Sequence, residues 1–362
     1  MMDNSLLTMN KEYIIPLLRR IHKNQEIIAP VKEKEDVLFS VIKSMDEITL
    51  DYKNAVLSPK GFFFPQQEVI FKYKEVSGDY ELSFTITDKK RLIFGIRSCD
   101  LKALSFLDAV YLGRYKDPYY QKKREDTTLI NLVCVSPDTN CFCVYANSGP
   151  MAEEGFDLQF VPLSNRFTIH VGSKKGQDIV EKYHYLFQEG TQKDLDEEYE
   201  VVHETKTKFL RYGEFATITQ KLIQEEVEES LWKMLGDRCQ NCGGCAYVCP
   251  TCSCFNVIDR PTTEREGVRI RTWDSCTLFG FTHLAEGLNP RKEKKDRIKR
   301  RFYHKLDCYM GRWGTCGCVG CGRCVTACLG GIDMSHVIHQ IRMEEYGEYI
   351  SAKDSEDYRY KG

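Results

Sequence analysis

The sequence lacks the features that would place the protein in a membrane, on a nucleotide or on nucleic acid. No run of eighteen apolar residues occurs among its 362 residues, so we expect no membrane span. It contains neither a G-x-G-x-x-G nor a G-x-x-x-x-G-K-[ST] loop, so we expect no flavin or nucleotide site on this chain. The net charge is −2, which gives no sign of nucleic-acid binding.

A secretory signal is also missing, because no basic segment followed by an apolar core opens the chain. We therefore expect a cytoplasmic protein. Cysteine, by contrast, is abundant, with seventeen residues. Without an export signal, such cysteines are expected to be reduced and to bind metal rather than form disulfides.

Eight of the cysteines form two runs, at residues 239–249 and 318–328. Both read C-x2-C-x2-C-x3-C, the ligand pattern of a ferredoxin with two iron–sulfur clusters. The two-residue spacers wrap three sulfurs around one cube, and the three-residue step turns the fourth sulfur towards the neighbouring cube. The predicted iron ligands are therefore Cys239, Cys242, Cys245 and Cys328 for one [4Fe–4S] cluster, and Cys318, Cys321, Cys324 and Cys249 for the other.

Zinc is the main alternative occupant of these runs, because zinc also binds groups of cysteines. Zinc sites usually use two separated C-x2-C pairs, and such pairs do not describe these longer runs. We therefore favour iron–sulfur clusters over zinc or disulfides. Exposed clusters are oxidised in air, so an oxygen-poor cytoplasm is the expected setting.

A possible third centre lies nearer the amino terminus. Residues 91–97 and 128–135 read as buried strands with a helix between them, which predicts a parallel βαβ unit. Asp100 is the expected N-cap of that helix. Ligands gather where parallel strands end, and the thiols expected at this edge are those of Cys99, Cys134, Cys141 and Cys143. They either hold a third cluster or are buried apolar cysteines, which are common.

Sixty-eight residues separate the two ligand runs, far more than a minimal ferredoxin needs. This insert carries Cys252, Cys254 and Cys276, which we expect to pack beside a cluster or to join a further site. Cys308 could complete a set of four with these thiols, although nothing in the spacing requires it, and Cys316 is expected to be a bystander. A basic run at residues 291–301 is expected to be a solvated helix face or a docking patch for an acidic redox partner. His304 and Lys305 could raise a cluster potential by their charge.

These patterns predict an α+β protein. Residues 1–210 are expected to form a mixed α/β domain with the βαβ unit and the cysteine-lined sheet edge. Residues 211–362 are expected to form a helical domain that carries the ferredoxin-like module with its long insert. Within it, residues 214–235 fit one long amphipathic helix.

Several motifs resemble one family of iron–sulfur proteins, typified by the beta subunit of cytoplasmic sulfhydrogenases and by the related iron–sulfur component of anaerobic sulfite reductase. Besides the paired cysteine runs, they are FFFPQ at 62–66, RSCD at 97–100, the stretch 117–125, CFC at 141–143, PTCSC at 250–254 and WDSC at 273–276. The resemblance spans about residues 60–345. Around residues 62–66 the chain is more similar to the hydrogenase side of the family.

The resemblance implies a non-catalytic redox subunit of a soluble multisubunit oxidoreductase. Proteins of this kind relay electrons between a catalytic partner and an FAD- and NAD(P)-binding ferredoxin-reductase-like subunit. The catalytic partner would be a NiFe hydrogenase, a sirohaem sulfite reductase or a heterodisulfide reductase type. Two other hypotheses stay open: a catalytic enzyme with substrate at the amino-terminal thiols, and a module in which the metal is structural.

Overall fold

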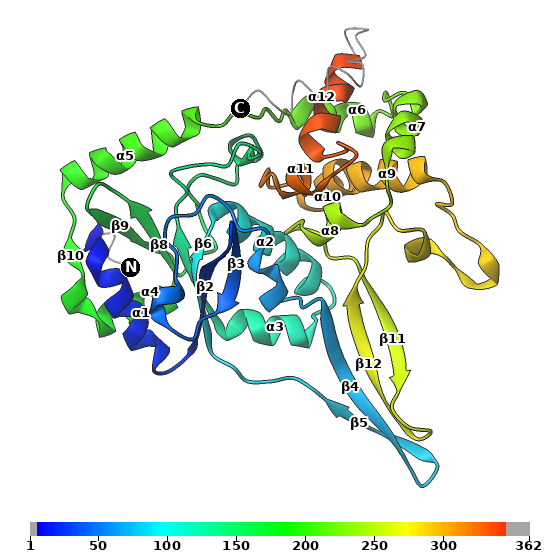
Figure 1. Cartoon of the computed structure of the whole chain (residues 1–362), viewed down its shortest axis with the longest axis horizontal. Coiled ribbons are helices and arrows are strands. Elements are labelled where there is room, and N and C mark those ends of the chain that lie inside the picture. The colour runs from blue at the N-terminus through cyan, green and yellow to red at the C-terminus, as the bar shows by residue number, and fades with distance from the viewer. Residues whose placement is uncertain (1–5, 345–362) are drawn as a thin grey trace.

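The computed structural model describes residues 6–344 and contains two β-sheets of different character (Figure 1). Within these residues the larger sheet has eight strands in the order β10-β1-β9-β8-β7-β6-β2-β3, and β2, β6, β7 and β8 run parallel. Its strands are β1 (Leu7–Asn10), β2 (Glu26–Glu33), β3 (Asp36–Val41), β6 (Arg91–Ile96), β7 (Thr127–Leu132), β8 (Leu158–Pro162), β9 (Arg166–Val171) and β10 (Gln188–Glu189). The predicted parallel unit β6–α2–β7 is present.

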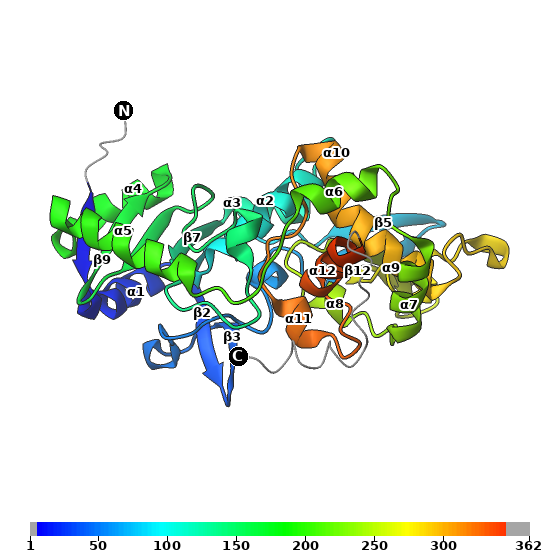
Figure 2. The same ribbon diagram turned by 90° about the horizontal axis from the view of Figure 1, so that it is seen from above.

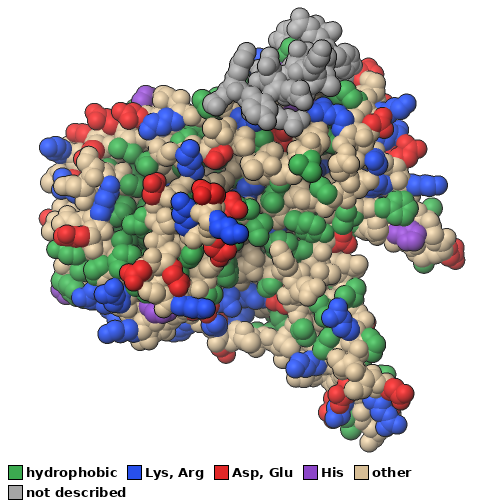
Figure 3. Space-filling model, viewed as in Figure 1, with side chains coloured by type: hydrophobic (Ala, Val, Ile, Leu, Met, Phe, Trp, Pro, Cys, Tyr) green, Lys and Arg blue, Asp and Glu red, His purple; other side chains and the backbone are tan. Residues whose placement is uncertain are grey.

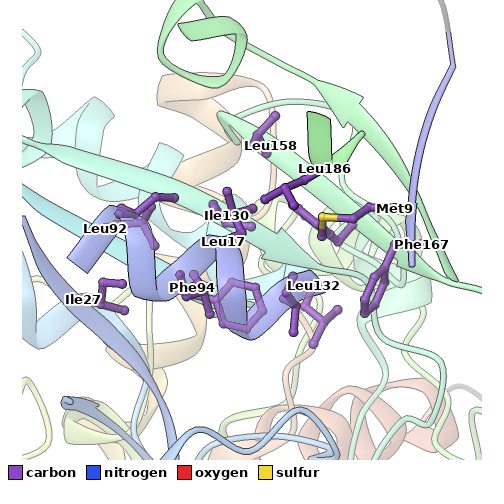
Figure 4. Close-up of a cluster of buried hydrophobic side chains, with 14 of the residues drawn as sticks. Met9, Leu17, Ile27, Leu92, Phe94, Ile130, Leu132, Leu158, Phe167 and Leu186 are labelled. Atoms are coloured by element: carbon purple, nitrogen blue, oxygen red, sulfur yellow. The ribbon is translucent and has the colours of Figure 1, made fainter. Parts of the chain in front are cut away.

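Helices cover both faces of this sheet, which is why its central strands β6, β7 and β8 are buried along almost their whole length. In β6, Leu92 and Phe94 face one core and Ile93 faces the other. Helix α1 packs on the first face, where Figure 4 shows Leu17 among the side chains of the strands. The helices of this half are α1 (Ile14–His22), α2 (Ser98–Tyr111), α3 (Pro118–Glu125), α4 (Lys174–Lys182) and α5 (Gln192–Thr207).

The second sheet is an arm that projects from the body (Figures 1 and 3). Its antiparallel order is β11-β12-β4-β5, with β4 (Gln67–Val76), β5 (Asp79–Phe84), β11 (Phe255–Pro261) and β12 (Glu266–Trp273). Strand β12 belongs to the insert between the ligand runs, whereas β4 lies about 200 residues earlier. The insert is therefore joined by hydrogen bonds to the amino-terminal half, across the predicted boundary at residue 210.

The carboxyl-terminal half is helical and lies beside the larger sheet (Figure 2). Its helices are α6 (Ala216–Ile223), α7 (Glu229–Arg238), α8 (Gly244–Tyr247), α9 (Lys294–Tyr303), α10 (Tyr309–Trp313), α11 (Arg323–Ala327) and α12 (Met334–Glu344), with a π-helical turn at His304–Cys308. The prediction of one helix over 214–235 is wrong, because the chain breaks at Glu225 in a left-handed conformation with φ 55°.

The α+β class predicted from the sequence is confirmed by this architecture. No helix among residues 6–344 combines the length and apolar character needed to cross a bilayer. The amino-terminal half supplies the sheet edge, and the helical half supplies two ligand loops, the second of which packs against that edge.

Candidate metal centres

The first ligand run forms a tight loop between two helices. Cys239 ends α7, and the chain then turns through Asn241 (φ 51°) and Gly243 (φ 73°) into the single turn of α8. Left-handed backbone of this kind favours asparagine and glycine. The backbone N–H of Asn241 lies 3.4 Å from the sulfur of Cys239. N–H donors to sulfur are one of the features that tune iron–sulfur clusters.

Four thiols line one hollow of about 430 Å³ beside this loop. Three come from the first run and the fourth from the end of the second run: they are those of Cys239, Cys242, Cys245 and Cys328. Ile298, Ile332 and Arg301 complete the wall. Four sulfurs spread around a hollow suit a [4Fe–4S] cube, and this set is the crossed set that the spacing predicts.

The second run repeats the local design of the first. Gly322 (φ 76°) precedes α11 as Gly243 precedes α8, and the N–H of Gly320 points to the sulfur of Cys318 at 3.5 Å. Burial raises the pKa of the Cys318 thiol to about 12, with Cys249 and Cys321 near enough to add to the shift. The structure thus brings Cys249 of the first run to the second set. A thiol with so high a pKa must release its proton when it binds iron.

The amino-terminal cysteines also meet. Cys99 lies in the first turn of α2, Cys134 follows β7, and Cys141 and Cys143 lie in the next loop. All four line one hollow of about 310 Å³, together with Arg97 and other residues of the sheet edge. Burial raises the pKa of Cys141 to about 12. Four thiols thus line this hollow, as the four thiols of the first set line theirs.

The loop of the second run packs directly on this amino-terminal site. The N–H of Phe142 donates to the carbonyl of Gly320 at 2.8 Å, and the Ser148 hydroxyl donates to Val319 at 2.6 Å. The amide of Asn54 donates to the carbonyl of Cys321 at 2.8 Å. The sulfur of Cys141 lies 3.7 Å from that same carbonyl. The second and the amino-terminal cysteine sets are therefore separated by little more than one loop.

A buried ion pair joins the same two regions. Arg323, in the second run, donates to both carboxylate oxygens of Asp100 at 2.7 and 2.8 Å, and both side chains are almost fully buried. The prediction of Asp100 as the helix N-cap is wrong, because α2 begins at Ser98 and Arg97 occupies the cap position. The carboxylate instead neutralises the arginine between two cysteine sets.

The three thiols of the insert lie beside the predicted ligands. A hydrogen bond with Cys252, ahead of other causes, lowers the pKa of Cys249, and the same contact raises the pKa of Cys252. Contact with Cys254 raises the pKa of Cys276.

The two remaining cysteines lie outside these sets. Cys308 accepts a hydrogen bond from Arg300 at 3.2 Å, and the sulfur of Cys316 lies 3.4 Å from the Thr219 hydroxyl. Among residues 6–344 no three His, Cys, Asp or Glu side chains are grouped so as to hold a single metal ion.

Sequence reasoning named Lys305 but missed the other buried cations near these thiols. Lys60 is 3% exposed; its ammonium donates to the carbonyls of Cys249 (2.7 Å) and Cys252 (3.2 Å) and lies 4.1 Å from the centre of the Trp273 ring. The expectation that the basic run is a solvated face is wrong for Arg297 and Arg301, which are buried. A signal was available, because Ile298, Phe302 and Leu306 recur every four residues and mark an apolar helix face next to these cations.

Two comparisons bear on these centres. A family model described as a 4Fe-4S dicluster domain matches residues 238–332, a segment that contains all eight cysteines of the paired runs. The chain is also similar to the sulfhydrogenase 2 subunit beta of Pyrococcus furiosus. The two are 30% identical over 334 residues, which cover 92% of this chain and 97% of that protein.

Proposed function

Because this chain belongs to the family of the sulfhydrogenase beta subunits, we propose that it relays single electrons through three [4Fe–4S] clusters. It is an iron–sulfur electron-transfer subunit related to a hydrogenase beta subunit. The proposed ligands are, for the first cube, Cys239, Cys242, Cys245 and Cys328; for the second, Cys318, Cys321, Cys324 and Cys249; and for the third, Cys99, Cys134, Cys141 and Cys143. The cubes supply the one-electron chemistry.

The observation that carries this proposal is the packing of the second ligand loop on the loop of Cys141 and Cys143. Electron hopping needs neighbouring centres, and a shared protein wall keeps the second and third centres close. The contacts from Phe142, Ser148 and Asn54 hold that wall in register. The buried ion pair between Arg323 and Asp100 is a further contact that joins the second run to the amino-terminal half.

The surroundings of the three centres suggest where electrons enter and leave. At the first hollow, Cys242 is exposed and Leu329 is 83% exposed. At the third hollow, Lys53 is exposed and Cys134 is half-buried. The second set lies between them in the order of contacts, because its loop packs on the third site and one of its cysteines, Cys249, comes from the first run. We assign the first and third centres as ports and the second as the interior link.

The partners follow from the same family. We propose that one port docks an FAD- and NAD(P)-binding subunit, and that the other docks a catalytic subunit, in a cytoplasmic complex. A NiFe hydrogenase is the favoured catalytic partner, because the relative is part of a sulfhydrogenase. Sulfite reductase and heterodisulfide reductase types are the other candidates.

A second candidate function comes from a cavity of about 1390 Å³ next to the third centre. It shares Ser98, Gly149 and Pro150 with the third hollow and is also lined by Lys102 and His170. Such a cavity favours a substrate bound beside the third cluster. A cube with four thiolate ligands has no open iron, however, so the full set of four cysteines supports the relay over catalysis.

Metal and sulfide analysis of the anaerobically purified chain, with Mössbauer spectroscopy, tests the proposal. We expect the iron and acid-labile sulfide of three cubes, and Cys141→Ala should remove one cube while leaving two. Cys316→Ala, at a thiol outside the three sets, should change nothing. Unchanged iron in Cys141→Ala would contradict the third site, and zinc without sulfide would establish a structural module instead. An iron site that binds added ligands would favour catalysis.

A further inference from the structure

Three buried cations follow one face of α9 and the π-helical turn after it. Arg297 and Arg301 are each 3% exposed and Lys305 is 4% exposed. They are spaced four residues apart, so they lie above one another on the same side of the helix. Cations are rarely so deeply buried unless they are paired. Negative charges are therefore expected close to these three cations.

The hydrogen bonds of Arg301 and Lys305 end on neutral oxygens. Arg301 donates to the carbonyl of Ile332 at 3.0 Å, and its Nε atom has no partner within residues 6–344. Lys305 donates to the Thr251 hydroxyl at 2.5 Å and to the carbonyl of Gly317 at 3.1 Å. In the described part of the chain, no carboxylate is found in a salt bridge with either of them. Two positive charges are thus left without an anion from the acidic side chains.

Thiols occupy the place of that anion. Arg301 lines the first hollow, and although burial lowers its pKa, Cys245 and Cys324 raise it above the ordinary value on balance. One of these thiols belongs to each ferredoxin-type set. The Thr251 hydroxyl that Lys305 contacts lies 3.4 Å from the sulfur of Cys249. Burial lowers the pKa of Lys305, and Cys249 together with other thiols raises it on balance. Both cations therefore face cysteines that would be thiolates in a loaded cluster.

The π-helical turn fixes the second of these contacts. Such turns are rare and often occur at functional sites. Here the carbonyl of Lys305 accepts the N–H of Gly317 at 2.6 Å, immediately before the first ligand of the second run. The backbone of Lys305 thus holds the second ligand loop while its side chain reaches the thiols of that set. His304, beside it, contributes no charge at neutral pH, because burial lowers its pKa to about 4.

We propose that Arg301 and Lys305 are the internal counter-charges of the two ferredoxin-type clusters and raise their reduction potentials. Arg301 serves both clusters and Lys305 serves the one that includes Cys249. The inference rests on the proposed cubes at these cysteines. Adding one electron to a cube adds one negative charge and moves no ligand. A fixed cation in a water-poor site stabilises that added charge with little screening by salt.

Redox titration of the full chain with dithionite under anaerobic conditions, followed by EPR, tests the proposal. Arg301→Met should lower the midpoint potentials of both ferredoxin-type clusters. Lys305→Met should lower mainly that of the second. Lys299→Met is the matched control: it removes one charge from the same helix, but Lys299 is 36% exposed and pairs with Glu229. It should leave every midpoint unchanged.

The charge-conserving variants Arg301→Lys and Lys305→Arg keep the test decisive if the Met variants lose their clusters. Clusters retained in these variants but lost in the Met variants would support the role of charge. Loss in both kinds of variant, or full clusters with unchanged midpoints in the Met variants, would overturn it. If the wild-type chain held no iron–sulfur clusters, the proposed function itself would fail, which iron and sulfide analysis shows separately.

Discussion

The two ligand runs have the same cysteine spacing but opposite surroundings. Around the first, Gln240 and Cys242 are exposed, and a Cβ added at Gly244 would meet nothing closer than 3.6 Å. Around the second, a Cβ at Gly322 would lie 2.4 Å from the carbonyl oxygen of Asn140. The motif therefore predicts which atoms would bind a cluster, whereas packing decides whether those atoms lie near the surface or in the protein interior.

Removing the exposed ligand of the first run should have the largest effect on function. Cys242→Ala is expected to abolish electron transfer to the external partner while leaving about two-thirds of the iron in the chain, if three cubes are present. Iron analysis measures the iron that remains, and coupled NAD(P)H-linked turnover of the whole complex measures electron transfer. Cys308→Ala is the control at a thiol outside the three sets. NAD(P)H-linked turnover that survived Cys242→Ala would refute the first cluster as a necessary step.

The buried ion pair of the second run should matter most for stability. Asp100→Asn leaves the Arg323 guanidinium buried without its counter-charge, and we expect a loss of about 3–5 kcal/mol in the free energy of unfolding. Urea unfolding measures it. Asp259→Asn breaks an exposed pair of the same bidentate kind, with Arg269, and should have no measurable effect. Equal losses in the two variants would show that burial is not the reason.

Glycine substitutions probe the surroundings of the two runs directly. Gly322→Ala places a Cβ against Asn140 at a φ of 76°, and we expect about 2–3 kcal/mol of destabilisation. Gly244→Ala lies in the first run, one position after the left-handed Gly243. It should be nearly neutral, because the φ of Gly244 is not left-handed and there is space for the added Cβ. Thermal unfolding of the two variants compares them. If Gly244→Ala were as harmful as Gly322→Ala, the first run would be as enclosed as the second.

The smallest expected effect concerns the stability of the fold at acidic pH. His304, beside the second run, has a pKa lowered by burial from 6.5 to about 4. The unfolded chain therefore takes up a proton before the folded chain does, so stability should fall as the pH drops from 6.5 towards 4. His304→Gln should reduce this loss by roughly 1–2 kcal/mol at pH 4.5. Urea midpoints at pH 7 and 4.5 measure the difference, and an unchanged pH dependence would count against it.

The short-range features could be predicted from the sequence because they depend on neighbouring residues. Two-residue spacers and glycines dictate a tight loop, so both ligand runs and the short helices after Gly243 and Gly322 follow from local geometry. Buried-strand runs at 91–97 and 128–135 are enough to predict β6 and β7, and the apolar stretch between them predicts α2. The error at residues 214–235 also has a local cause, since an apolar pattern does not reveal a left-handed Glu225.

The tertiary structure alone decided which distant segments meet. Pairing of β4 with β12 and the ion pair of Arg323 with Asp100 each join residues with no sequence pattern in common. The physical reason is that buried polar groups choose partners by position in space, and chain closure over about 200 residues leaves no local trace. The sequence by itself predicted the cysteine ligands, and the fold determined how each set of cysteines is screened, linked and exposed.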